Sequence, residues 1–108
     1  MSKTTTPQTH EATVCASILD LSHVRSEPRA HVGRGRDHVG YDVTLPRAGN
    51  VLRIVAEDAE APTVTVYTFT RNGLMLTDAT FGSSVPRMAI LAYVDTMTDL
   101  DTTGLVSR

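Results

Sequence analysis

The stretch that decides the fold is residues 63–81, which read TVTVYTFTRNGLMLTDATF. Residues 63–70 are dense in β-branched and aromatic side chains, the composition typical of a strand. Asn72-Gly73 follows, and this dipeptide favours a tight hairpin turn because both residues tolerate positive φ. The segment therefore predicts a β-hairpin whose second strand begins near Leu74.

Both faces of this hairpin carry apolar side chains. With a two-residue turn, one face holds Val64, Val66, Met75, Ala79 and Phe81. The opposite face then holds Tyr67, Phe69, Leu74 and Leu76, whereas a three-residue turn with a bulge would change this sorting. Such a hairpin is either covered on both sides or offers one face to a partner, so the second set is a candidate partner or dimer face.

Strands are also predicted before the hairpin, and a helix after it. Residues 41–45 alternate apolar and polar side chains, and residues 51–56 place Leu52, Ile54 and Ala56 on one face. Gly82-Ser83-Ser84 breaks the last strand and caps a helix over 85–100. The apolar stripe of that helix comprises Ile90, Tyr93, Val94, Met97 and Leu100.

The fold class predicted is α+β, with an antiparallel β-meander of about four strands packed against the C-terminal helix. Residues 12–24 form a further element before the sheet: Val14, Ile18 and Leu21 fit a helical stripe, but the β-branched residues favour a strand almost as well. The 108 residues are the length of one domain, which we place at 10–101. Residues 1–9 are predicted to be a disordered arm and 102–108 a short tail.

A long loop rich in Arg, His and Gly is predicted at 25–40. Its candidate binding residues are Arg25, Arg29, His31, Arg34, Arg36 and His38. Arginines on a glycine-containing segment can grip phosphate or carboxylate groups through the two-pronged guanidinium. The loop has no aromatic side chain on which a nucleic-acid base could stack, and its three glycines match no nucleotide-binding fingerprint.

Composition narrows the classes of function. The net charge of −2 is unlike that of a dedicated nucleic-acid-binding domain, and the single Cys15 excludes an internal disulfide. The four histidines show no ligand spacing, so we predict neither a metal site nor a cofactor. Cys15 is predicted to be a core residue, and Asp78 an exposed strand residue, so no catalytic group is expected.

The sequence thus favours a small, non-enzymatic protein-binding module, of accessory or inhibitory type, whose partner is another protein or a second copy of itself. The alternative is a nucleic-acid or phosphate-ligand binder that uses residues 25–38. Neither a signal sequence nor a membrane segment is evident, which predicts a cytoplasmic protein without a membrane partner. Nine of its ten basic residues are arginine, a pattern typical of genes from GC-rich bacteria and their phages or other mobile elements.

Overall fold

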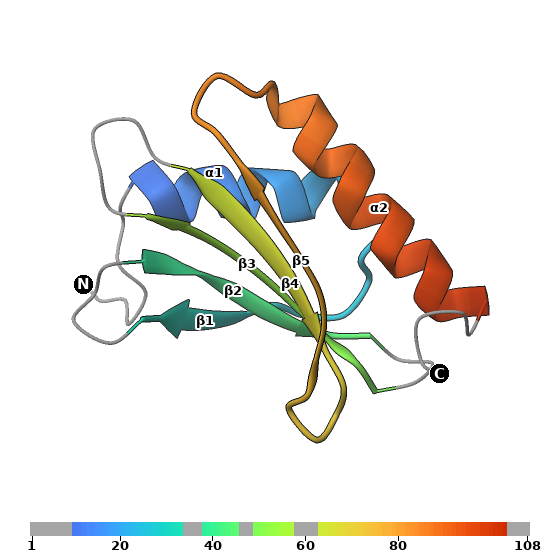
Figure 1. The fold of residues 1–108 in the computed structure, drawn as a ribbon. Helices are drawn as coiled ribbons and strands as arrows, with labels where there is room; N and C mark the ends of the chain where they lie inside the picture. Colours follow the sequence, from blue (N-terminus) through green and yellow to red (C-terminus); the bar gives the residue numbers. More distant parts are fainter. Residues whose placement is uncertain (1–9, 34–37, 46–48, 58–62, 104–108) are drawn as a thin grey trace.

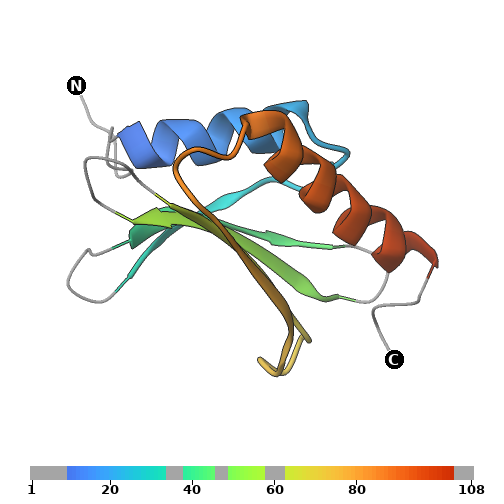
Figure 2. The same ribbon diagram turned by 45° about the horizontal axis from the view of Figure 1, so that its top comes forward.

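A five-stranded antiparallel sheet carries both helices of the chain on one of its faces (Figures 1 and 2). The computed structural model describes residues 10–33, 38–45, 49–57 and 63–103. Its elements, in chain order, are α1 (His10–Leu21), β1 (Arg29–Val32), β2 (His38–Thr44), β3 (Val51–Glu57), β4 (Val64–Phe69), β5 (Met75–Phe81) and α2 (Arg87–Thr103). The strands follow one another across the sheet in sequence order, so the predicted α+β meander is confirmed.

Side chains along the strands alternate between a buried face of the sheet and the opposite face. Leu52, Ile54 and Ala56 of β3 are at most 1% exposed, as are Val43 of β2 and Val66 of β4. Because successive side chains of a strand point to opposite faces, these residues form one continuous apolar layer. Burial of this layer from water is the main stabilising contribution to the fold.

The two helices complete the core from above this layer. α1 contributes Cys15, Ile18 and Leu19. α2 contributes Ile90, Leu91 and Val94, with Tyr93 and Met97 packed against the same cluster. The element predicted as helix or strand at 12–24 is therefore a helix, and Cys15 is the core residue that was predicted. The buried hydroxyl of Thr68 is paired with that of Thr77 at 2.6 Å.

A polar contact links the end of α1 to α2. The backbone N–H of His23 donates to the Asp95 carboxylate at 2.7 Å, and the His23 ring lies 3.1 Å from a carboxylate oxygen of Asp99. These two carboxylates of α2 hold the segment that leads from α1 to the sheet.

One prediction about the elements was wrong. Residues 25–40 are not one loop, because they contain β1 and the first residues of β2, and the sheet therefore has five strands where about four were predicted. Three of the four β1 residues are exposed, so this edge strand shows no apolar alternation and is defined only by its backbone pairing with β2. The helix predicted over 85–100 begins at Arg87 and extends to Thr103; residues 1–9 and 104–108 lie outside the described residues.

The hairpin has the longer of the two turns that the sequence allows. The N–H of Thr70 donates to the Leu74 carbonyl at 2.8 Å, which leaves three residues in the turn, and Gly73 adopts φ 91°. A bulge follows, so Met75 lies opposite Phe69 and is 49% exposed, and it does not share the face of Val64 and Val66 as a two-residue turn would require. Beyond the bulge the predicted sorting holds, with Val66 opposite Ala79 and Val64 opposite Phe81.

Gly40 marks the closest approach between β2 and β3. A Cβ atom at this position would fall on the carbonyl oxygen of Ile54 and lie 2.7 Å from the Cα of Val55. Both neighbours are backbone atoms of the central strand, so neither can rotate away. A glycine inside a strand often marks such a close backbone approach.

We therefore predict that Gly40→Ala lowers the free energy of unfolding by roughly 2 kcal/mol, the usual scale for forced overpacking. Gly82→Ala is the matched control, because nothing lies within 4 Å of the Cβ that it would add and its φ is not positive. Urea denaturation of both variants measures the difference. Equal stabilities would show that β2 and β3 do not approach as described.

A second pair of variants tests the one-sided core. Leu52→Ala removes a fully buried side chain and should cost about 2–5 kcal/mol of unfolding free energy. Leu74→Ala makes the same change at a side chain that is 69% exposed, and it should alter the stability by less than about 0.5 kcal/mol. Comparable losses in the two variants would contradict the assignment of the buried face.

Candidate functional site

The face of the sheet opposite the helices, here called the open face, is covered by no element within the described ranges (Figure 2). One row of side chains crosses it in register through all five strands: Arg29, Asp42, Arg53, Tyr67 and Asp78. Along the row, basic and acidic groups alternate over Arg29, Asp42 and Arg53, and the aromatic Tyr67 and the acidic Asp78 follow. Four of its five side chains carry a charged group, which makes the row a candidate binding site.

The centre of this row is a two-pronged ion pair between Asp42 and Arg53. The Nε of Arg53 donates to Oδ1 of Asp42 at 2.7 Å, and its Nη2 donates to Oδ2 at 3.1 Å. The hydrogen bond to Asp42 raises the pKa of Arg53, against an opposing effect of burial. Both side chains are less than one third exposed, so the pair is partly shielded from solvent and fixes the arginine in place.

Aromatic rings extend this ordered cluster. The guanidinium carbon of Arg53 lies 5.0 Å from the ring centroid of Phe69, within the range of a cation–π contact. The rings of Tyr67 and Phe69 stack with centroids 5.7 Å apart. Asp42, Arg53, Phe69 and Tyr67 are therefore in continuous contact across three strands, and we call these four residues the central cluster.

Two histidines lie beside the central cluster. The rings of His31 and His38 stack at 5.5 Å, and Nδ1 of His31 is 4.0 Å from a carboxylate oxygen of Asp42. The pKa of His31 is lowered, first by burial and then by the charge of Arg53. Asp42 raises this pKa but does not prevail, because its carboxylate is already bound to Arg53.

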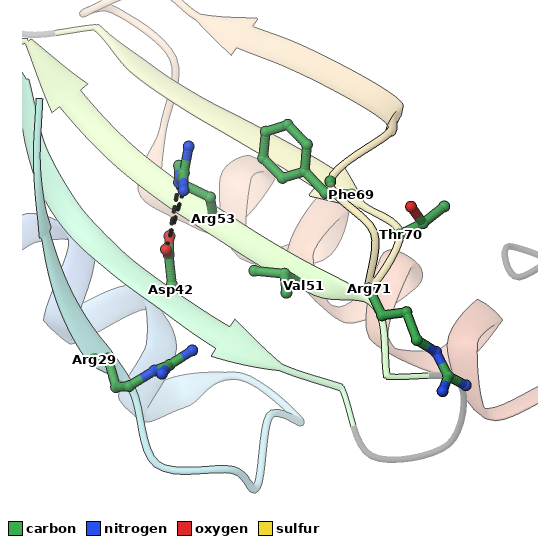
Figure 3. A pocket seen from close by; sticks show the side chains of 8 residues that line it. Arg29, Asp42, Val51, Arg53, Phe69, Thr70 and Arg71 are labelled. Atoms are coloured by element: carbon green, nitrogen blue, oxygen red, sulfur yellow. Dashed lines mark hydrogen bonds and ion pairs between the residues drawn. The ribbon is translucent and has the colours of Figure 1, made fainter.

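An open hollow of about 270 Å³ borders the central cluster at the end of the sheet where β3 begins. The residues that line it are Arg29, Asp42, Val51, Arg53, Phe69, Thr70, Arg71 and Gly73. Figure 3 shows Arg29 reaching inward from β1, with the Asp42–Arg53 pair above Val51 and Arg71 at the tip of the β4–β5 hairpin. Among the described residues that line the hollow, three are arginines and one, Asp42, carries a carboxylate.

The structure brings together part of each predicted site. Of the predicted loop residues, Arg29, His31 and His38 lie on the open face, whereas Arg25 lies in the connection before β1 and does not line the hollow. Arg34 and Arg36 fall outside the described residues. Of the predicted partner face, Tyr67 and Phe69 belong to the central cluster, Leu74 directly follows the hairpin turn, and Leu76 lies at the bulge in β5.

Asp42, Arg53 and Arg71 were not predicted as site residues. The sequence signal available for Arg53 was the alternation of side chains along its strand. This alternation places Arg53 with Val51 and Val55 on the face opposite Leu52 and Ile54. The partnership with Asp42 depends on the register of β2 and β3, which pairs these two residues directly.

Other chemistries find less support in the structure. Among the described residues, no three His, Cys, Asp or Glu side chains are grouped so that they could hold a metal ion. A second hollow of about 220 Å³, beside α1, includes Asp20, Glu27 and Tyr41 in its lining, and burial raises the pKa of Tyr41. No arginine lines it. No helix in the described ranges has the length and apolar character needed to span a membrane.

The lowered pKa of His31 predicts a loss of stability in acid. Below its ordinary value of 6.5 the unfolded chain takes up a proton that the folded chain resists, so the stabilising contribution is complete above that pH and is lost as the pH falls. His31→Asn should therefore show a weaker decline in unfolding free energy than the native chain between about pH 7 and pH 5. Urea denaturation across this range measures it, and identical declines in the two proteins would contradict the prediction.

Comparison with known proteins identifies no relative of this chain. A scan of protein-family models gave no match, and searches of the curated proteins and of the solved structures gave none either. The contacts on the open face are therefore the basis on which a function can be inferred.

Proposed function

We propose that this chain is a small, non-enzymatic binding module that docks an acidic protein partner on the open face of its sheet. The observation that carries the proposal is the central cluster: Tyr67 and Phe69, with Arg53 held over Phe69, lie on a face that no described element covers. Tyrosine, phenylalanine and arginine are the residues enriched at protein interfaces, and the first and last dominate binding hot spots.

The position of the candidate catalytic groups supports binding over catalysis. Cys15 is fully buried between α1 and the sheet, where a substrate has no access. The ring of His31 contacts Asp42 and His38, and no hydrogen bond joins it to a described hydroxyl or thiol that it could activate. Asp78 lies exposed on β5 opposite Tyr67.

The charges that line the hollow are the reason for proposing an acidic partner. At the end of the open face where β3 begins, three arginines line the hollow, and Asp42 is the only carboxylate among its described lining residues. Asp42 is paired with Arg53, so the positive charge of Arg29 favours a negatively charged surface on the partner and raises the rate of encounter. Asp78 and Glu57 lie on other parts of the face and do not line the hollow.

A protein partner fits the face better than a nucleic acid, which is the alternative function. Binding of single strands requires aromatic rings with free faces on which bases can stack. Here one face of Tyr67 is stacked on Phe69 and Arg53 lies over the Phe69 ring, so fewer ring faces are free for a base.

Selection from a displayed peptide library tests the proposal. Peptides enriched on the native chain should be rich in Asp and Glu, and Tyr67→Ala should weaken their binding by roughly tenfold or more, the loss typical of a hot-spot residue. Met88→Ala should leave the affinity unchanged, because this side chain is 65% exposed on α2, which packs on the opposite face.

Thr80→Glu provides a variant that removes no packing. Thr80 is exposed on β5 and shares a row of the open face with Thr65, so a carboxylate there should repel the same peptides while the fold is preserved. Equal binding by the native chain and both open-face variants would overturn the proposal. Retention of oligonucleotides in place of peptides would favour the alternative, and a dimer that Tyr67→Ala dissociates in sedimentation would replace the partner by a second copy of the chain.

A further inference from the structure

The hollow beside the central cluster has the size of a side-chain pocket. Its volume of about 270 Å³ is below the range of roughly 300–1,000 Å³ that is usual for small-molecule and cofactor sites. It is open to solvent along the sheet and is bounded by the β4–β5 hairpin, whose tip projects away from the helices (Figures 2 and 3). A single side chain of a docked partner would fill much of it.

The charges around the hollow are unevenly compensated. Both carboxylate oxygens of Asp42 accept from Arg53, although Arg29 is its direct cross-strand neighbour on the other side. Among the described residues, no carboxylate forms an ion pair with Arg29. Figure 3 shows the Arg29 side chain directed into the hollow from the edge strand. A guanidinium held there attracts an anion that the chain itself does not supply.

The rest of the lining combines an apolar floor with a second cation. Val51 lies between the Asp42–Arg53 pair and the hairpin, and it is paired in register with Phe69. Arg71 lines the far end, where its side chain runs beside the turn that contains Gly49. The methylene groups of an acidic side chain would contact Val51 and Phe69 while its carboxylate reached the guanidinium group of Arg29.

We infer that this hollow receives the carboxylate of a glutamate or aspartate side chain from the docked partner, with Arg29 as its ligand. The inference rests on the proposed function, because it assumes that a protein docks on the open face. It adds a rule for which segments of the partner are recognised. The partner places an acidic side chain beside the central cluster, and the apolar side chains that flank it cover Tyr67 and Val51. Alternating acidic and apolar residues in an extended segment satisfy this rule, since every second side chain points to the same side.

Nuclear magnetic resonance titration tests the inference with defined probes. The ¹⁵N-labelled full chain is titrated with an acetylated and amidated peptide of alternating glutamate and valine, and with the same peptide carrying glutamine for glutamate. The glutamate peptide should shift the amide resonances of Val51 and Thr70 and the side-chain Nε–H of Arg29, and the glutamine peptide should bind about tenfold more weakly, as expected for loss of a charge-assisted contact.

Matched arginine variants locate the contact. Arg29→Ala should weaken the glutamate peptide by about tenfold and leave the glutamine peptide unaffected, because only the charged pair is lost. Arg25→Ala removes the same charge from an arginine outside the hollow and should change neither affinity. Urea denaturation of both variants confirms that they fold, and Arg29→Lys should restore part of the affinity because the positive charge returns without the planar fork.

The other possible outcomes of the titration contradict different parts of the inference. Equal binding of the two peptides on the open face would overturn the carboxylate pocket and leave the docking face in place. Shifts confined to α1 and α2, or no shifts at millimolar peptide, would overturn the pocket and count against the docking face as well. Stronger shifts at Arg29 with inorganic phosphate or with oligothymidylate than with the glutamate peptide would replace the carboxylate by a phosphate group, free or in a nucleic acid.

Discussion

Burial of only one side of the sheet is the constraint on which the rest of the structure depends. Leu52 and Ile54 point toward α1 and α2 and are fully buried. Because side chains alternate along β3, the burial of Leu52 and Ile54 places Val51, Arg53 and Val55 on the opposite face of the sheet. The position of Arg53 on the open face is therefore a consequence of how the core is packed, and not of a local preference of the arginine.

No described helix packs on the open face, so the side chains on it are ordered by contacts with one another. Arg53 supplies this order because it contacts Asp42 on one neighbouring strand and Phe69 on the other. Gly40 brings β2 and β3 close together in the row of His31 and Val55, and Val55 is only 4% exposed although no described element covers this face. The same closeness explains the environment of His31, which is shielded from water and near the charge of Arg53.

The sequence predicted the elements with strong local signals and missed those defined by pairing. Asn72-Gly73 and the β-branched run before it marked the hairpin, and the apolar stripe of α2 marked a helix on the sheet. β1 was missed because an exposed edge strand such as Arg29–Val32 needs no apolar alternation. The helix at His10–Leu21 was ambiguous because Thr13 and Val14 have β-branched side chains, and packing of Cys15 and Ile18 against the sheet outweighs that weak preference.

The candidate site could be predicted only in part, for a related physical reason. Single residues such as Arg29, His31, Tyr67 and Phe69 were visible because their side chains are of the types that bind. Their grouping was not visible, because Asp42 and Arg53 meet only through the register of β2 and β3, and Arg71 joins them only through the hairpin turn. The central cluster is already ordered by its own contacts, so a partner would not have to immobilise Arg53 or Phe69 on binding. Such preorganisation lowers the entropic cost of association. It leaves Arg29, which forms no ion pair with a described carboxylate, as the group in the hollow whose charge a partner would neutralise.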